Sequence, residues 1–158
     1  METHRKSFSD QPNLYTVIGE IVKLMSCSKV YRGYTIEHLE KLVLPPLVTN
    51  RCRLYFDQTD GELIGFISWT FLKPDTEVKY IARKGLIDWD DWNTGDAEGN
   101  LWVMDFIAPF GEAKEMCRHT YQDLADRWPG RRLFFRRSAQ NDRINSVMLK
   151  MAADTVMH

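Results

Sequence analysis

A single carboxylate interrupts an apolar, aromatic segment in the second half of the chain. Residues 101–111 have the sequence Leu-Trp-Val-Met-Asp-Phe-Ile-Ala-Pro-Phe-Gly, with Asp105 near the centre. Aromatic and branched apolar residues in this density are typical of a buried strand. An ionised carboxylate in such a strand is costly unless it is paired or hydrogen-bonded. Asp105 is therefore predicted to be either a structural anchor or a catalytic group.

A run of arginines interleaved with aromatic residues is the main charged feature. Its members are Arg127, Arg131, Arg132, Arg136 and Arg137. Such a run could bind nucleic acid, but Phe134 and Phe135 between the arginines are typical of a strand core. The commonest alternative is a solvated face with local ion pairs.

The composition limits the classes of function. A chain of 158 residues with 44% apolar and 27% charged residues fits one globular domain over residues 1–158, with residues 1–11 flexible. A formal net charge of -1 gives no general attraction to nucleic acid or to a membrane surface. No apolar run approaches the ~20 residues of a membrane span, so stable membrane insertion is not expected.

The cysteines and the start of the chain indicate a cytoplasmic protein. Cys27, Cys52 and Cys117 are widely separated and odd in number, which argues against a disulfide framework. A reducing compartment fits this pattern. Residues 1–7 lack the apolar core of a signal peptide. The cysteines and histidines show no metal-ligand spacing, so no metal site is expected.

The first half of the chain predicts two helices and a hairpin. A helical period begins after Pro12 and ends near Ser26, and Thr35 is a plausible cap for a second helix that Pro45-Pro46 should end. Residues 29–34 between these helices should form a loop. Residues 53–57 and 62–70 are expected to be strands joined by the hairpin signal Asp60-Gly61.

The second half predicts helices and strands in alternation. A short helix should begin at Pro74 and finish near Gly85, followed by a strand over residues 101–108. A helix over residues 112–127, a strand over 132–137 and a final amphipathic helix over 141–157 complete the pattern. This order predicts an α/β (α+β) fold with a central, mostly antiparallel sheet flanked by helices.

Several segments together resemble the RTX toxin-activating lysine acyltransferases of the haemolysin C type. The most specific one is the Asp-aromatic-Ile-Ala-Pro-Phe-Gly run that starts at Asp105, and the second is the Trp-x-x-Gly-Asp segment that starts at Trp92. Gly19-Glu20-Ile21, residues 26–34, Ser68-Trp69 and residues 77–80 occur in the matching order. The resemblance extends over residues 17–137, with three extra residues between Asp96 and Trp102.

This resemblance implies a fold, an activity and partners. Members of the family are similar in fold to the GNAT acetyltransferases. They move a fatty acyl group from an acyl carrier protein, which serves as co-substrate in place of a bound cofactor, to internal lysines of an RTX protoxin. They are cytoplasmic and tend to form homodimers. A histidine after the first helix and the Asp of the Asp-aromatic-Ile-Ala-Pro-Phe-Gly run are the catalytic pair, so the Asp corresponds to Asp105.

The catalytic histidine of the family does not carry over, because Tyr31 occupies its position. A phenol is protonated at neutral pH, so Tyr31 could donate a hydrogen bond to an oxyanion, or act as a base only beside a cation such as Lys29 or Arg32. The alternative is an aromatic residue that packs in a loop. His38 and His119 are the other candidate bases, although a lone helical histidine is usually a surface residue.

Two functional hypotheses follow from the resemblance. The chain is an active acyltransferase with Asp105 and Tyr31 in its catalytic site, or a catalytically impaired relative that binds the toxin or the acyl carrier protein. Because acyl carrier proteins are strongly acidic, the family also suggests that Arg131, Arg132 and Arg136 belong to a docking surface for that partner.

Overall fold

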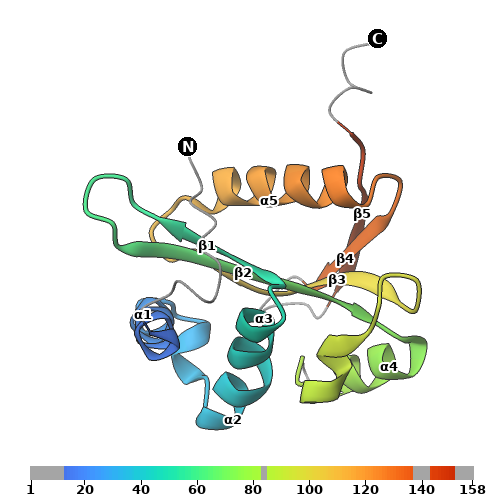
Figure 1. Ribbon diagram of the computed structural model, residues 1–158, viewed down its shortest axis with the longest axis horizontal. Coiled ribbons are helices and arrows are strands. Elements are labelled where there is room, and N and C mark those ends of the chain that lie inside the picture. Colours follow the sequence, from blue (N-terminus) through green and yellow to red (C-terminus); the bar gives the residue numbers. More distant parts are fainter. Residues whose placement is uncertain (1–12, 83–84, 137–142, 152–158) are drawn as a thin grey trace.

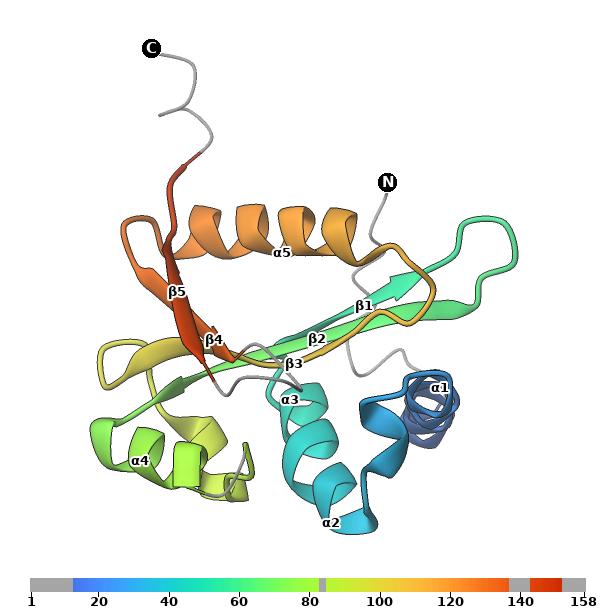
Figure 2. The ribbon, with the colours of Figure 1, turned by 180° about the vertical axis from the view of Figure 1, so that it is seen from behind.

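A computed structural model describes residues 13–82, 85–136 and 143–151 of the chain. These residues form a five-stranded sheet with strands in sequence order and helices on both faces (Figure 1; Figure 2). The strands are β1 (Cys52–Phe56), β2 (Leu63–Leu72), β3 (Asn100–Ile107), β4 (Arg132–Arg136) and β5 (Ile144–Met148). Neighbouring strands are antiparallel except for β3 and β4, which are parallel. The predicted fold class is confirmed, and the arrangement is consistent with a GNAT-like fold.

One helix, α5 (Ala113–Arg127), covers one face of the sheet (Figure 1). It connects β3 to β4, which are parallel and therefore need a crossover rather than a tight turn. Its buried residues Met116, Leu124 and Ala125 pack on side chains from β1 to β4 and on Leu149, and we call this cluster the α5-side core.

The other face of the sheet carries the remaining helices (Figure 2). These are α1 (Leu14–Ser26), η2 (Tyr31–Gly33), α2 (Ile36–His38), η3 (Leu39–Val43), α3 (Leu44–Val48), α4 (Pro74–Ala82) and η4 (Trp89–Asn93). Two apolar clusters lie beneath them. The α1-side core contains Ile21, Leu24, Met25, Val43, Leu47, Leu63, Phe66 and Ile107. The α4-side core contains Leu42, Leu72, Tyr80, Ile87, Trp92 and Trp102.

The first helix begins where the sequence predicts. Asn13 caps α1 by accepting a hydrogen bond from the backbone N–H of Tyr15 at 2.9 Å. Pro12, which was expected to lie in the first turn of the helix, is outside the described residues. The predicted loop over residues 29–34 contains the short 3₁₀ turn η2.

The prediction that Pro45-Pro46 ends the second helix is wrong. Helical backbone continues from Ile36 through a π-helical turn, η3, into α3, and both prolines lie in the first turn of α3. Proline has no backbone N–H, so the hydrogen-bond ladder to the preceding turn is interrupted at both residues, next to the π-helical turn η3.

The predicted C-terminal helix over residues 141–157 is also wrong in its described part. Residues 144–148 form the strand β5, which pairs antiparallel with β4 from Arg136↔Ile144 to Arg132↔Met148. The apolar spacing of Ile144, Val147 and Met148 fits a helix, but β4 offers an edge that needs a hydrogen-bonding partner. Such tertiary pairing overrides a local period. Residues 141–142 and 152–157 of that prediction lie outside the described residues.

The strand that carries the carboxylate contains a β-bulge. Ser68 of β2 pairs with Asp105, whereas the next residue, Trp69, pairs with Val103, so Met104 is an extra residue in β3. Val103 packs against the α5-side core, and regular alternation would place Asp105 on that same face. The extra residue directs Asp105 to the opposite face, beneath η2.

Candidate active site

The turn η2 places two tyrosines on one side of the backbone. A 3₁₀ helix has three residues per turn, so Tyr31 and Tyr34 project in nearly the same direction. Their ring centroids are 5.0 Å apart in an edge-to-face arrangement. Tyr34 contacts both the α1-side core and the α4-side core, so the tyrosine pair lies where these two clusters meet.

Asp105 lies beneath this pair with only 4% of its surface exposed. Its Oδ1 accepts a hydrogen bond from the hydroxyl of Tyr34 at 2.5 Å, and its backbone N–H donates to Oγ of Ser68 at 3.1 Å. Its Oδ2 is buried and has no hydrogen-bond partner among the described residues. An unsatisfied buried acceptor of this kind costs about 1–3 kcal/mol.

Burial raises the pKa of Asp105 from 3.8 to about 6, against the smaller lowering effect of the hydrogen bond from Tyr34 and then of the nearby Tyr31 hydroxyl. Desolvation disfavours the charged form of a carboxyl group. Burial, followed by the charge of Asp105, raises the pKa of Tyr31 and of Tyr34, so both phenols stay protonated. Near neutral pH the site therefore holds a carboxylate that is close to its pKa, together with two hydroxyl donors.

Tyr31 also satisfies the backbone of the strand beneath it. Its hydroxyl accepts a hydrogen bond from the N–H of Phe106 at 3.0 Å. The pairing of β3 with β4 extends only to Trp102 and Phe134, so β4 does not supply a partner for Phe106. The tyrosine hydroxyl replaces a strand neighbour at this point and remains a donor for a further group.

The structure places His38 behind Tyr34 and not against the carboxylate. The two rings are stacked with centroids 4.6 Å apart. Nδ1 of His38 accepts the backbone N–H of Thr35 at 3.0 Å and lies 2.8 Å from the Thr35 hydroxyl. His38 and Thr35 thus cap the start of α2 reciprocally, and the imidazole supports the ring of Tyr34.

His119 lies on the opposite face of the sheet from Asp105. It belongs to α5, where its Nδ1 is 2.7 Å from a guanidinium nitrogen of Arg53 and 3.3 Å from the hydroxyl of Tyr55. Partial burial, followed by the charge of Arg53, lowers the pKa of His119. The structure does not bring this candidate base to the site.

The three arginines of the predicted docking surface lie in different surroundings. Arg131 lies over the ring of Phe71 in the α5-side core at 5.0 Å, and Arg136 lies over the ring of Tyr80 in the α4-side core at 5.5 Å. Arg132 is exposed, and its guanidinium donates to the hydroxyl of Ser146 at 3.0 Å. Arg131 and Arg136 therefore face opposite sides of the sheet, and the three do not form one cluster.

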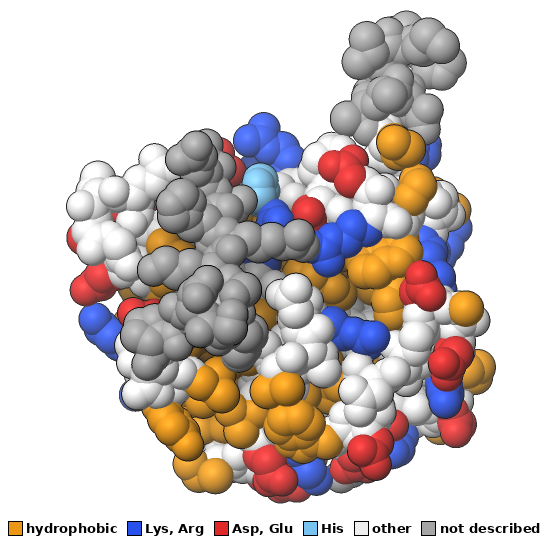
Figure 3. Space-filling model, in the orientation of Figure 1, with side chains coloured by type: hydrophobic (Ala, Val, Ile, Leu, Met, Phe, Trp, Pro, Cys, Tyr) orange, Lys and Arg blue, Asp and Glu red, His pale blue; other side chains and the backbone are white. Residues whose placement is uncertain are grey.

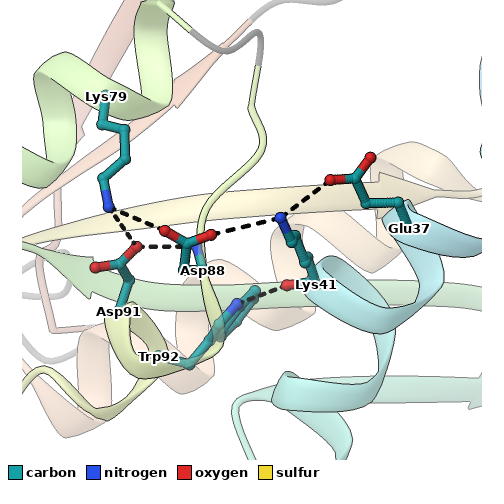
Figure 4. A network of polar contacts seen from close by, with 6 residues as sticks. All are labelled: Glu37, Lys41, Lys79, Asp88, Asp91 and Trp92. Carbon is teal, nitrogen blue, oxygen red and sulfur yellow. Dashed lines mark hydrogen bonds and ion pairs between the residues drawn. The ribbon is translucent and has the colours of Figure 1, made fainter.

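A chain of ion pairs connects the helices beside the site (Figure 4). Lys41 of η3 lies 3.0 Å from Glu37 and 3.5 Å from Asp88. Lys79 of α4 bridges Asp88 at 3.2 Å and Asp91 at 3.3 Å. These contacts hold α2 and η3 against α4 and η4. Figure 4 also shows the indole N–H of buried Trp92, which donates to the carbonyl of Lys41 at 2.8 Å and adds a further tie between η4 and η3.

Two surface grooves lie away from the carboxylate. The larger, of about 540 Å³, is lined by residues of β1 and α5 that include Tyr55, Met116 and His119. The smaller, of about 260 Å³, lies beside α1 and the β1–β2 turn and includes Glu20 and Phe110 in its lining. Neither is lined by Asp105, so this conformation covers the carboxyl group.

The sequence prediction located Asp105 and Tyr31 but missed Tyr34 as the direct partner of the carboxylate. The Tyr-x-x-Tyr spacing is the signal that could have found it, provided that residues 31–34 were predicted as a 3₁₀ turn rather than a loop. Tyr80 was also missed as a member of this group. Burial, followed by the charge of Asp105, raises the pKa of Tyr80 to about 12. No spacing signal links it to Asp105, because it comes from a different element.

Within residues 13–82, 85–136 and 143–151, no group of three or more His, Cys, Asp or Glu side chains is arranged to hold a metal ion. No helix in these ranges is long and apolar enough to span a membrane.

Residues 10–148 match the model of the RTX toxin acyltransferase family. The RTX-II toxin-activating lysine-acyltransferase ApxIIC of Actinobacillus pleuropneumoniae is 33% identical over 110 residues, which are 70% of this chain and 66% of that protein. The uncharacterized protein sll0720 of Synechocystis sp. is 33% identical over 104 residues, 66% of this chain and 69% of that protein. The protein-lysine myristoyltransferase RtxC of Kingella kingae is 30% identical over 112 residues, 71% of this chain and 64% of that protein. The chain thus aligns with about two thirds of the length of these relatives.

Proposed function

The chain belongs to the RTX toxin acyltransferase family, and from this premise we propose that it is a toxin-activating protein-lysine acyltransferase. It would move a fatty acyl group from an acyl carrier protein to internal lysines of an RTX protoxin. The names of two relatives support lysine acylation, and one of them specifies a myristoyl group.

The observation that carries the proposal is the buried carboxylate at the position of the family's catalytic Asp. A lysine ammonium has an ordinary pKa of ~10.4 and must lose a proton before it attacks a thioester. Asp105 has one oxygen without a partner among the described residues, and an ammonium group would supply the missing donor. General base assistance of this kind is worth ~10²–10⁴ in rate.

Tyr31 is the second catalytic residue in this proposal. Its hydroxyl accepts from the N–H of Phe106, which strengthens the hydroxyl as a donor. We assign it to the oxyanion that forms when the amine attacks the thioester carbonyl. Because Asp105 is only 4% exposed, the amine reaches the carboxylate only when the side chains that cover it move.

The partners and the location are parts of the same proposal. Acyl carrier protein is the acyl donor, and no bound cofactor is required. The described cysteines Cys27, Cys52 and Cys117 are free thiols, which supports a cytoplasmic location. A homodimer is the proposed assembly, and sedimentation equilibrium of the purified protein tests it.

Co-expression with an RTX protoxin tests the function directly. Mass spectrometry of the protoxin should find acylated lysines with the wild-type chain and none with Asp105→Asn. Asp126→Asn changes an exposed carboxylate of α5 in the same way and should leave acylation unchanged. Tyr31→Phe should reduce acylation, because the oxyanion loses a donor.

Two results would contradict the proposal. Absence of acylation with the wild-type chain would favour a binding protein that has lost catalysis. Full acylation with Asp105→Asn would show that the Asp105 carboxylate is not required for catalysis. Full acylation with Tyr31→Phe would leave the function intact and exclude only the oxyanion role.

A further inference from the structure

The two oxygens of Asp105 are in different surroundings. Oδ1 accepts the hydroxyl of Tyr34 at 2.5 Å, a length typical of a charge-assisted O–H···O⁻ bond. Oδ2 is buried with no hydrogen-bond partner in the described part of the chain. Because a carboxylate accepts on both oxygens, Oδ2 is the oxygen whose hydrogen-bonding capacity a new donor would satisfy.

Tyr34 is itself held in place from behind. Its ring is stacked on His38 with an interplanar angle of 19°, and it contacts the edge of Tyr31 on another side. His38 is fixed by the reciprocal cap with Thr35. The hydroxyl of Tyr34 is therefore directed at Asp105 before any substrate arrives.

We propose that Tyr34 is the positioning residue of this site, which occupies Oδ1 and makes Oδ2 of Asp105 the general base in place of the missing histidine. This inference rests on the proposed acyltransferase function. Tyr34 acts through Asp105 and does not itself exchange a proton with the substrate.

A lysine ammonium gives one proton to Oδ2, and the neutral amine attacks the thioester carbonyl carbon. The new C–N bond forms and the C–S bond breaks, while a second proton leaves nitrogen and neutralises the departing thiolate. Asp105 then releases its proton to solvent. The products are an amide, a thiol and one proton.

The buried environment brings the proton affinities of the Asp105 carboxylate and the substrate lysine amine closer together. The carboxyl pKa of about 6 is about two units above the ordinary value of 3.8, and each unit is a tenfold change in proton affinity. The same burial lowers the pKa of an ammonium group that enters the site. The hydrogen bond from Tyr34 acts in the opposite direction, because it favours the carboxylate and keeps it ionised near neutral pH.

Four elements contribute the titratable or charged groups around this carboxylate. They are Tyr31 from η2, with Tyr34 directly after it, His38 from α2, Tyr80 from α4 and Arg136 from β4. Tyr31, Tyr34 and Tyr80 have raised pKa values and stay neutral over the range in which Asp105 titrates. The guanidinium of Arg136 lies over the ring of Tyr80.

The test is a titration of the ¹³Cγ resonance of Asp105 in the wild-type chain and in Tyr34→Phe, which retains the ring and its stacking. The wild-type midpoint should lie near pH 6. In Tyr34→Phe it should rise by about one unit, because the ionised form loses a charge-assisted hydrogen bond. Tyr121→Phe removes a hydroxyl that, among the described residues, forms hydrogen bonds with the backbone of Met148 and Lys150, and it should leave the midpoint unchanged.

The wild-type protein supplies a second measurement should Tyr34→Phe fail to fold. The hydroxyl proton of Tyr34 should resonate far downfield while Asp105 is ionised, and should move upfield with the same midpoint when Asp105 is protonated. The inference is overturned if the chemical shift of the Tyr34 hydroxyl proton does not change at the pH at which Asp105 titrates. It is also overturned if folded Tyr34→Phe has the same Asp105 midpoint as the wild-type chain.

Acylation assays separate this inference from the proposed function. The acidic limb of kcat/KM should follow the Asp105 midpoint and move to higher pH in Tyr34→Phe. If acylation proceeds in Tyr34→Phe with an unmoved acidic limb, the positioning role is wrong and the function stands. If the wild-type chain acylates nothing while the titrations behave as expected, the proposed acyltransferase function is wrong. The effect of Tyr34 on the Asp105 carboxyl group would then be a structural feature without this catalytic role.

Discussion

At the scale of single residues, the buried carboxyl group of Asp105 lowers the stability of the fold when it ionises. Its pKa is raised by burial, so the folded chain binds a proton at this carboxyl group more tightly than the unfolded chain does. The stability that the group contributes is fully present below the unfolded pKa and is lost as pH rises through the folded pKa. For Asp105 this window extends from 3.8 to about 6.

We therefore expect Asp105→Asn to stabilise the protein at neutral pH while it abolishes catalysis. The difference in the free energy of unfolding, variant minus wild type, should increase from pH 4 to above pH 6 by up to about 3 kcal/mol, since two pKa units correspond to that energy. Urea unfolding at several pH values measures it. Asp126→Asn is the matched control and should show a flat difference. A flat difference for Asp105→Asn would mean that the carboxyl group has an ordinary pKa.

At the scale of elements, the position of the site depends on how η3 and α4 are held together. The ion pairs of Figure 4 are partly exposed, and each such pair is worth about 0–1 kcal/mol. Asp91 differs from the other members, because its carboxylate also accepts the backbone N–H of Asp88 at 2.9 Å and so caps η4. Its side chain is 16% exposed, compared with 38% for Lys79.

Asp91→Ala should thus destabilise the protein more than Lys79→Met. We expect a loss of about 1–2 kcal/mol for Asp91→Ala, from the cap and the ion pair together, and less than about 1 kcal/mol for Lys79→Met. Denaturant unfolding in low salt and in 1 M NaCl measures both. In 1 M NaCl, the loss of stability caused by Lys79→Met should become smaller, whereas most of the loss caused by Asp91→Ala should persist. Equal losses for the two variants would contradict the capping role.

At the scale of the whole molecule, no single sign of charge dominates the face drawn in Figure 3. Basic and acidic side chains are intermixed there, in keeping with the formal net charge of -1. Recognition of the proposed acidic carrier protein would therefore depend on local groups. Among the three arginines of the predicted docking surface, Arg132 is exposed, whereas Arg131 and Arg136 lie against aromatic rings.

Because their surroundings differ, Arg132 and Arg131 should respond differently to charge reversal. Arg132→Glu should weaken binding to acyl carrier protein several-fold, mainly through the association rate, without a change in stability. Arg131→Glu should lower stability as well, because the guanidinium of Arg131 also donates to the carbonyl of Gly99 at 2.5 Å. Arg118→Glu, an exposed charge reversal on α5, is the control. Titration calorimetry at two salt concentrations measures the binding of acyl carrier protein to the three variants. If Arg132→Glu binds as tightly as the wild type, Arg132 is not part of the docking surface.

The amino-acid sequence alone identified the family, predicted a sheet flanked by helices and singled out Asp105 as a candidate functional carboxylate. It succeeded where the information is local. The period of α1, the Asp60-Gly61 turn and the aromatic segment around Asp105 each occupy one short stretch of chain.

The tertiary structure decided which groups meet. The bulge at Met104 turns Asp105 to the face beneath η2, and Tyr34 becomes its partner across 71 residues of sequence. Likewise β4 draws residues 144–148 into a strand, although their own spacing favours a helix. Register and long-range hydrogen bonds are set by the pairing of distant segments, so the Tyr-x-x-Tyr spacing could place Tyr34 beside Tyr31 but could not show that its hydroxyl meets Asp105.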